Sequence, residues 1–225
     1  MIKAIVFDFD GVLVESAGIK TRAVRELFSE WPHAVEEMVE YHLANMGVSR
    51  YEKFRHFYEN VLGEEYTEEA GLELGRRFSK LVYHEVLRAP LVDGSAEMLR
   101  DNHCEYLMFI ASGTPHEELN DIVAARGLHA YFRGVFGSPK KKAEILRSII
   151  AGHGLFGNEV VFVGDATTDM RAAKQAGTYF IARVSGAESA LLYERHRVRD
   201  MTGLVDAVRA LDAQWPYKEA VWKRR

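Results

Sequence analysis

Two aspartates stand two positions apart at the end of the first apolar run of this chain. The run covers residues 2–9 and is rich in β-branched residues, which is typical of a strand buried on both faces, and it ends in Asp8-Phe9-Asp10-Gly11. Two neighbouring carboxylates repel each other, so one stays protonated unless a cation lies between them. Mg²⁺ is such a cation, because it takes oxygen ligands and often keeps several waters. Asp8 and Asp10 therefore indicate a magnesium site at a strand tip, with a plain Asp-Gly turn as the alternative.

Groups that could hold an anion follow a second apolar run, over residues 105–111. The Ser112 hydroxyl, the Gly113 N–H and the positive end of the next predicted helix together form a potential anion site. Thr114 and Glu117 are predicted to form the capping box of that helix, with Pro115 at its first position. Taken alone, the Ser-Gly-Thr segment is also consistent with a simple cap.

Two more segments place charged residues next to predicted helices. The lysine run 140–142 precedes one helix, although three consecutive lysines are also typical of a solvated surface. Asp165 and Asp169 follow the apolar run 159–163 and offer two carboxylates four residues apart. Open α/β sheets bind ligands beyond the carboxyl ends of their strands, so we expect these segments to meet the first aspartate pair there.

The elements that must position these residues alternate between strand and helix. This alternation predicts an α/β fold with a Rossmann-like, open, mostly parallel sheet. The predicted strands cover residues 2–9, 105–111, 159–163 and 179–184, and the clearest helices cover residues 143–150 and 169–176.

Residues 15–88 interrupt the alternation, because they contain no strand pattern and their apolar residues follow helical spacing. We predict three or four amphipathic helices here, forming a helical cap domain over residues 15–88, with residues 1–14 and 89–225 forming the core domain. An aromatic stripe in this insert is predicted to pack between helices rather than to bind a ligand: Tyr51, Phe54, Phe57 and Tyr58.

Composition excludes several classes of protein. The chain has 29 Lys and Arg against 33 Asp and Glu, a net charge of −4, so we expect no general attraction to nucleic acids or anionic membranes. No apolar run approaches the roughly 20 residues that span a bilayer. The single cysteine, Cys104, cannot form an internal disulfide, which fits a reducing, cytoplasmic location. The basic cluster at residues 218–225 is interpreted as a solvated tail, and the oligomeric state stays open between monomer and homodimer.

Taken together, the four segments resemble the four motifs of the haloacid dehalogenase superfamily. The first is Asp8-x-Asp10-Gly-Val-Leu, the second Ser112-Gly-Thr, the third a lysine before a helix, and the fourth Gly164-Asp165-x-x-x-Asp169. The match covers about two-thirds of the chain, in the same order as in the family. The helical insert resembles the cap of the β-phosphoglucomutase and phosphoglycolate phosphatase branch.

The resemblance implies a role for each matched residue. Asp8 would be the nucleophile that forms an aspartyl-phosphate, and Asp10 the general acid and then the general base. Mg²⁺ would be held by Asp8, the Asp10 backbone carbonyl and Asp165, with Asp169 supporting the site. Ser112 and the Gly113 amide would bind the phosphoryl oxygens, and a lysine would pair with the nucleophile.

Three features differ from the family pattern or leave it ambiguous. The motif lysine is Lys142, at the predicted helix start, or alternatively Lys140; Lys141 is the least favoured. Ala166 replaces the common serine after Asp165. The sugar-phosphate mutases of this branch usually carry a histidine where this chain has Lys20, which weakens the interpretation of the chain as a mutase.

We therefore expect an Mg²⁺-dependent phosphatase of a small phosphorylated metabolite. The first alternative is a β-phosphoglucomutase-like phosphotransferase, and the cap segment Gly47-Val48-Ser49-Arg50 resembles the substrate loop of those enzymes. Arg50 could hold a distal phosphate or carboxylate through its planar guanidinium, or it could be a surface residue of a helix N-terminus. A phosphonate-cleaving enzyme with a cap lysine as Schiff base is less favoured, because neither Lys20 nor Lys53 lies in a motif of that branch.

Overall fold

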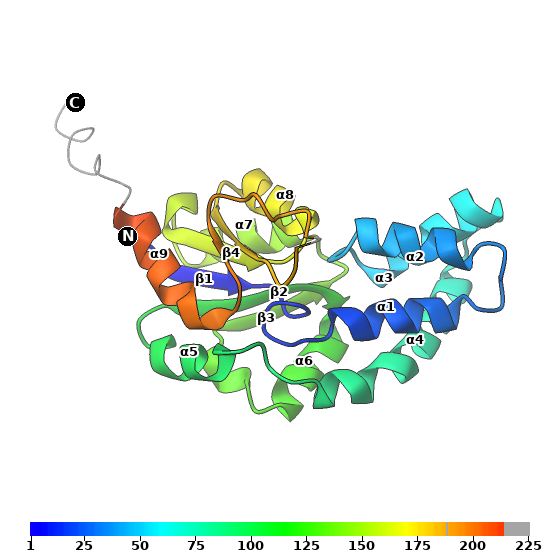
Figure 1. Cartoon of the computed structure of the whole chain (residues 1–225), viewed down its shortest axis with the longest axis horizontal. Coiled ribbons are helices and arrows are strands. Elements are labelled where there is room, and N and C mark those ends of the chain that lie inside the picture. The colour runs from blue at the N-terminus through cyan, green and yellow to red at the C-terminus, as the bar shows by residue number, and fades with distance from the viewer. Residues whose placement is uncertain (188, 214–225) are drawn as a thin grey trace.

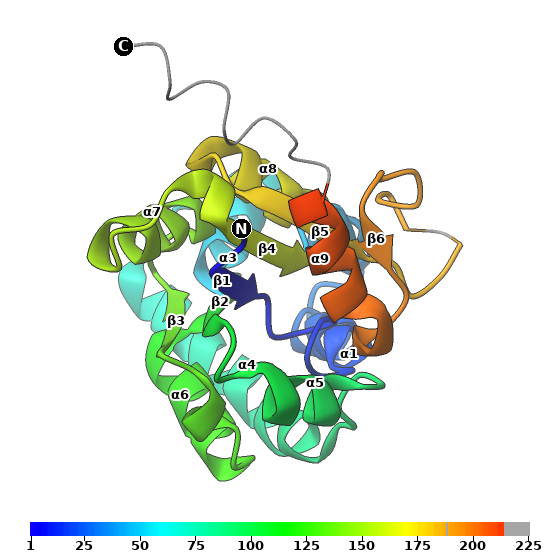
Figure 2. The same ribbon diagram turned by 90° about the vertical axis from the view of Figure 1, so that its left-hand side faces the viewer.

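The fold is built around a six-stranded, fully parallel sheet with strand order β3-β2-β1-β4-β5-β6 (Figures 1 and 2). The computed structural model describes residues 1–187 and 189–213, so the basic cluster of Lys218, Lys223, Arg224 and Arg225 lies outside the described residues. The strands are β1 (Ala4–Phe7), β2 (Leu107–Pro115), β3 (Gly134–Ser138), β4 (Val160–Gly164), β5 (Tyr179–Arg183) and β6 (Arg197–Val198). The predicted α/β class is confirmed.

Both faces of the sheet are buried, which explains why its strands are continuous apolar runs. Successive side chains of a strand point to opposite faces, so Ala4 and Val6 pack on one side while Ile5 and Phe7 pack on the other. Helices α7 and α8 cover the first face, and α5, α6 and α9 cover the second (Figure 2). These helices are α5 (Ser95–Asn102), α6 (His116–Ala125), α7 (Lys142–Gly152), α8 (Thr167–Ala176) and α9 (Leu204–Ala213).

A helical insert separates β1 from β2 and extends beyond the carboxyl end of the sheet (Figure 1). We call residues 15–88 the cap; the division of the chain at these bounds stays a prediction. Two members of the predicted aromatic stripe, Phe54 and Phe57, are fully buried against Phe28, with ring centroids 6.0 and 4.2 Å away. The cap elements are α1 (Ala17–Leu27), α2 (Val35–Ala44), α3 (Arg50–His56), the π-helical turn η1 (Phe57–Leu62) and α4 (Glu68–Arg88).

Several predicted boundaries change in the structure. β2 runs on to Pro115, so Thr114 belongs to the strand, and α6 begins at His116 without a side-chain cap. The predicted capping box is therefore wrong: the Thr114 hydroxyl is directed at Asp10 instead. β3 and β6 were not predicted, because β3 contains two glycines and β6 is only two residues long. Short 3₁₀ turns complete the fold at η2 (His129–Tyr131), η3 (Gly157–Glu159) and η4 (Met201–Gly203).

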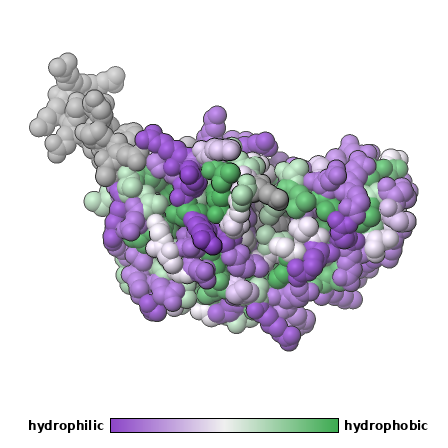
Figure 3. Space-filling model, in the orientation of Figure 1, coloured by the Kyte–Doolittle hydropathy of each residue, from purple (hydrophilic) through white to green (hydrophobic). Residues whose placement is uncertain are grey.

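The surface agrees with the composition. Hydrophilic side chains cover most of the face drawn in Figure 3. None of the helices in the described part of the chain combines the length and apolar character that crossing a lipid bilayer demands. Cys104 is exposed and has no second thiol to pair with in the sequence.

Candidate active site

Asp8 lies one residue beyond β1, at the carboxyl edge of the sheet. Its side chain is 4% exposed, and both carboxylate oxygens have a partner. Oδ1 accepts a hydrogen bond from the Phe9 N–H at 2.7 Å, and Oδ2 accepts one from Lys142 Nζ at 2.8 Å. Because the first contact comes from the next residue and the second from a residue 134 positions away, this carboxylate is held in one orientation.

Lys142 is the first residue of α7, and its ammonium lies between two carboxylates. Besides Asp8, it donates to Asp169 Oδ1 at 2.5 Å, and its side chain is only 7% exposed. Lys140 and Lys141 are exposed. Of the three adjacent lysines, the structure therefore directs Lys142 at Asp8, as the sequence prediction preferred. Despite its burial, the two carboxylates raise the pKa of Lys142, so the ammonium stays charged.

Three acidic side chains form a cluster beside this lysine. One carboxylate oxygen from each of Asp8, Asp165 and Asp169 lies within 4.8 Å of the others. Burial raises the pKa of Asp8 to about 7, with the Lys142 ammonium opposing the shift and Asp169 adding to it. Burial, Asp8 and Asp169 likewise raise the pKa of Asp165. One ammonium does not balance three carboxylates, so the donor set fits a hard divalent cation.

Gly11 allows Asp165 to reach this cluster. Its φ of +74° is a left-handed conformation that favours glycine, and a Cβ there would collide with the Asp165 carboxylate. The glycine of the first motif is thus required by a contact between two strand tips.

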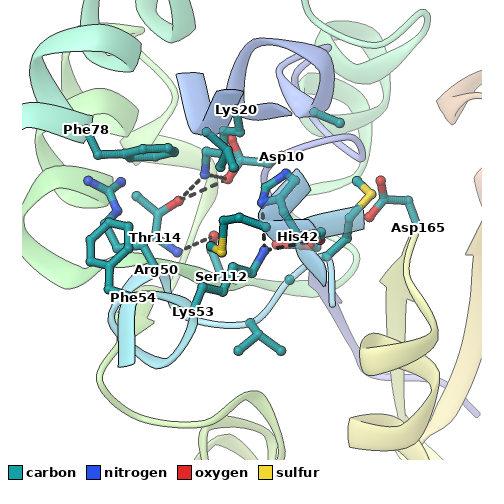
Figure 4. A pocket seen from close by; sticks show the side chains of 18 residues that line it. Asp10, Lys20, His42, Arg50, Lys53, Phe54, Phe78, Ser112, Thr114 and Asp165 are labelled. Carbon is teal, nitrogen blue, oxygen red and sulfur yellow. Dashed lines mark hydrogen bonds and ion pairs between the residues drawn. The ribbon is translucent and has the colours of Figure 1, made fainter. Parts of the chain in front are cut away.

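Asp10 does not join the acidic cluster through its side chain. Its carboxylate accepts a hydrogen bond from Ser16 Oγ at 2.7 Å. It also accepts one from Thr114 Oγ1 at 3.0 Å and forms an ion pair with Lys20 (Figure 4). Burial alone would raise its pKa, but the Lys20 ammonium and these hydrogen bonds hold the pKa of Asp10 below its usual value. The carboxylate is therefore ionised in this arrangement. Its backbone carbonyl remains the predicted metal ligand.

Ser112 and Gly113 lie in the last part of β2, the strand that pairs with β1. The Ser112 side chain is 1% exposed, and its Oγ accepts a hydrogen bond from the Thr114 N–H at 3.1 Å, which leaves its own proton free to donate. Both residues line a cavity of about 60 Å³ beneath the cap, together with Asp8, Asp10 and Asp165. The structure thus brings the predicted anion site and the acidic cluster to one cavity.

The cap loop lies directly over this cavity. Gly47 has φ +79°, and a Cβ at this position would come within 2.8 Å of Lys142 Nζ and 3.3 Å of Asp169 Oδ1. The neighbouring Met46 carbonyl accepts a hydrogen bond from the Thr168 hydroxyl. The cap is therefore closed onto the sheet edge, and only a residue without a side chain fits at Gly47 in this closed arrangement.

Comparison with known proteins agrees with this arrangement of motifs. The profile of the haloacid dehalogenase-like hydrolases matches residues 2–177. The chain belongs to this hydrolase family. It is 26% identical over 196 residues to a phosphoglycolate phosphatase of Pasteurella multocida, covering 82% of this chain and 86% of that protein.

Solved structures of other members share the fold. A β-phosphoglucomutase from Clostridium difficile superposes with a TM-score of 0.75 at 18% identity, over 96% of this chain and 99% of that one. CbbY from Rhodobacter sphaeroides, solved with xylulose-(1,5)bisphosphate, superposes with a TM-score of 0.69 at 17% identity, over 89% and 95% of the two chains. At these identities the likeness describes the fold of a haloacid dehalogenase-like hydrolase and nothing finer.

Arg50 lines the cavity, but its guanidinium is already engaged. It forms a bidentate ion pair with Glu118 at 2.6 and 3.0 Å, donates a hydrogen bond to Ser79 Oγ at 2.8 Å, and lies 4.6 Å from the centroid of the Phe78 ring. Its side chain is 6% exposed, so the surface alternative is wrong. Binding of a distal substrate group by Arg50 stays a prediction.

The sequence predicted no contact for three residues that line the cavity, Lys20, His42 and Lys53. Lys20 pairs with Asp10 and also contacts Thr114 Oγ1 at 2.6 Å, and Lys53 contacts His42 inside the cap. Their types were visible in the sequence, where Lys20 and Lys53 stand out as lysines within amphipathic helices. Their partners were not, because each contact joins segments that are separated along the chain.

Proposed function

We propose that this hydrolase is an Mg²⁺-dependent phosphatase that transfers the phosphoryl group of a small phosphate ester to Asp8 and then to water. The observation that carries the proposal is the placement of Lys142 against Asp8, 2.8 Å apart, beside three buried carboxylates and beneath a closed cap. An ammonium held next to a carboxylate nucleophile is suited to neutralise the charge of a transferring phosphoryl group. The phosphatase relative at 26% identity supports the same class of reaction.

The residues that would hold Mg²⁺ are Asp8, the Asp10 carbonyl and Asp165, with Asp169 supporting the site. The fit rests on the donor chemistry, since oxygen ligands converge within 4.8 Å. Burial, together with neighbouring carboxylates, raises the pKa of Asp8 and Asp165, and a bound cation would oppose that shift. When bound, the ion supplies charge neutralisation for the carboxylates and the phosphoryl oxygens. Asp169 is held in place by its contact with Lys142 and by a hydrogen bond that it accepts from the Ala166 N–H at 3.2 Å.

The protein groups divide the reaction into two steps. In the first, an Asp8 oxygen attacks phosphorus and the bond to the ester oxygen breaks, while Asp10 gives a proton to the departing alcohol. In the second, Asp10 takes a proton from water, whose oxygen attacks phosphorus and releases inorganic phosphate and free Asp8. Ser112 Oγ and the Gly113 N–H bind phosphoryl oxygens throughout.

Lys20 favours one of the two states of Asp10. The ion pair keeps Asp10 ionised, which is the form that activates water. To act as an acid first, Asp10 must carry a proton, a form that the Lys20 ammonium disfavours. The Thr114 hydroxyl, in contact with both groups, keeps them aligned.

A panel of phosphate monoesters tests the proposal. We expect Mg²⁺-dependent release of inorganic phosphate, loss of activity in EDTA, and poor replacement by Ca²⁺, whose 6–8 looser ligands disturb the attack geometry. Peptide mass spectrometry after acid quench should locate a phosphoryl group on Asp8. Full activity in EDTA, or no release from any ester, overturns the proposal. Conversion of glucose 1-phosphate to glucose 6-phosphate without phosphate release favours the phosphotransferase instead.

A further inference from the structure

The cationic side chains around the cavity are not equally neutralised. Lys20 pairs with Asp10, Arg50 pairs with Glu118, and Lys142 pairs with two aspartates. Lys53 lines the same cavity, yet within the described part of the chain its ammonium forms no salt bridge with a carboxylate. A charge without a counterion inside a protein is unfavourable unless something else compensates it.

Lys53 is fixed by contacts with His42 that use two of its three N–H donors. It belongs to α3, is 5% exposed, and its Nζ lies 3.0 Å from His42 Nδ1 and 3.4 Å from the His42 carbonyl oxygen (Figure 4). The other ring nitrogen of His42 lies 3.3 Å from Thr21 Oγ1, which fixes the imidazole. An ammonium has three N–H donors, so two are directed at His42 and the third has no partner among the described residues.

Electrostatics make this position receptive to negative charge. Burial, together with the Lys20 and Lys142 ammonium groups, lowers the pKa of Lys53 to about 7. Burial, together with the Lys53 and Lys20 ammonium groups, lowers the pKa of His42 to about 3. The imidazole is therefore neutral and cannot balance the charge of Lys53. An incoming anion would supply the missing counterion and complete the third hydrogen bond.

The geometry points to Lys53 as the group that binds a second anionic group of the substrate, a carboxylate or a second phosphate carried by the same molecule whose phosphoryl group reaches Asp8. This inference rests on the proposed function and names its substrate class. The cavity is small, about 60 Å³, which favours a compact substrate with a short carbon chain between its anionic ends.

Non-hydrolysable phosphonates test this without turnover. Titration calorimetry in Mg²⁺ would compare 3-phosphonopropionate with propylphosphonate, which carries a methyl group in place of the carboxylate, and propane-1,3-diphosphonate would distinguish a second phosphate from a carboxylate. We expect a ligand with a second anionic group to bind about 10- to 100-fold more tightly than propylphosphonate, the range for a hydrogen bond to a charged group. Lys53→Met should abolish this preference and leave the affinity for propylphosphonate within about twofold.

The exposed cap residue Lys80 provides the matched control, since Lys80→Met removes one positive charge from the same domain and should keep the preference. Circular dichroism would check that Lys53→Met is folded, and the wild-type comparison of ligands needs no variant. Equal binding of all three ligands by the wild type, or an equal loss for all three in Lys53→Met, overturns the inference. If the protein hydrolyses esters but shows no preference for ligands with a second anionic group, only the Lys53 site is overturned. If it shows that preference but hydrolyses no ester, the proposed phosphatase function is overturned.

Discussion

Replacing Lys142 by Met keeps the length of the side chain and removes the only cation that contacts the acidic cluster of the described residues. In the structure the ammonium lies 2.8 Å from Asp8 and 2.5 Å from Asp169, with 7% of its side chain exposed. At an effective dielectric constant of about 20, two unit charges 2.8 Å apart interact by about 6 kcal/mol, which is an upper bound because desolvation opposes it. Removing one partner of a buried ion pair typically costs about 3–5 kcal/mol.

Only part of that energy concerns catalysis. Loss of a donor that stabilises a transition state lowers kcat by about 10²–10³-fold, and we expect Lys142→Met to fall in this range. Steady-state hydrolysis of 4-nitrophenyl phosphate at saturating Mg²⁺ measures it, with melting temperatures recorded in parallel. Mg²⁺ should raise the melting temperature of the variant more than that of the wild type, because the variant has lost its resident cation.

The two neighbouring lysines serve as internal controls. Lys140 and Lys141 are exposed, and surface substitutions usually change stability by no more than about 0.5 kcal/mol. Lys140→Met and Lys141→Met should therefore keep near-normal turnover. Wild-type turnover in Lys142→Met would refute the role given to Lys142. An inactive Lys140→Met variant beside it would assign that role to Lys140 instead.

Three further outcomes are expected. Asp8→Asn keeps the shape of the side chain but removes the nucleophile, so turnover should drop about 10³-fold or more with unchanged circular dichroism; near-normal hydrolysis contradicts the covalent step. Lys20→Met removes the ammonium that keeps Asp10 ionised, so the pKa of Asp10 should rise and the acidic limb of the pH profile of hydrolysis should move to higher pH; an unchanged pH profile contradicts that role. His42 has a folded pKa of about 3 against about 6.5 when exposed, so the unfolded chain takes up the extra proton and stability falls as the pH drops through that interval, by up to about 1.4 kcal/mol per unit. Urea unfolding at several pH values should show a shallower fall for His42→Gln, and an identical slope would contradict the assignment.

The sequence by itself determined the chemistry of the sheet edge. Asp8 and Asp165 each follow a buried, strongly apolar strand, and Ser112 lies in the last part of another. Parallel strands bring their carboxyl ends to one edge regardless of the loops between them. Local signals of this kind, a strand that ends and a helix that begins, need only a few consecutive residues. They were sufficient for the α/β class, for the order of the motifs and for a helical insert after the first strand.

Only the tertiary structure decided which side chains face one another. Lys142 rather than its neighbours meets Asp8, because the first turn of α7 directs just one of three adjacent side chains inward. Lys20 reaches Asp10 and Lys53 is left without a carboxylate because of how the cap helices close on the sheet edge. Such contacts join residues whose spacing along the chain carries no periodic signal, and their partners are chosen by packing and by the requirement that buried charges find a counterion.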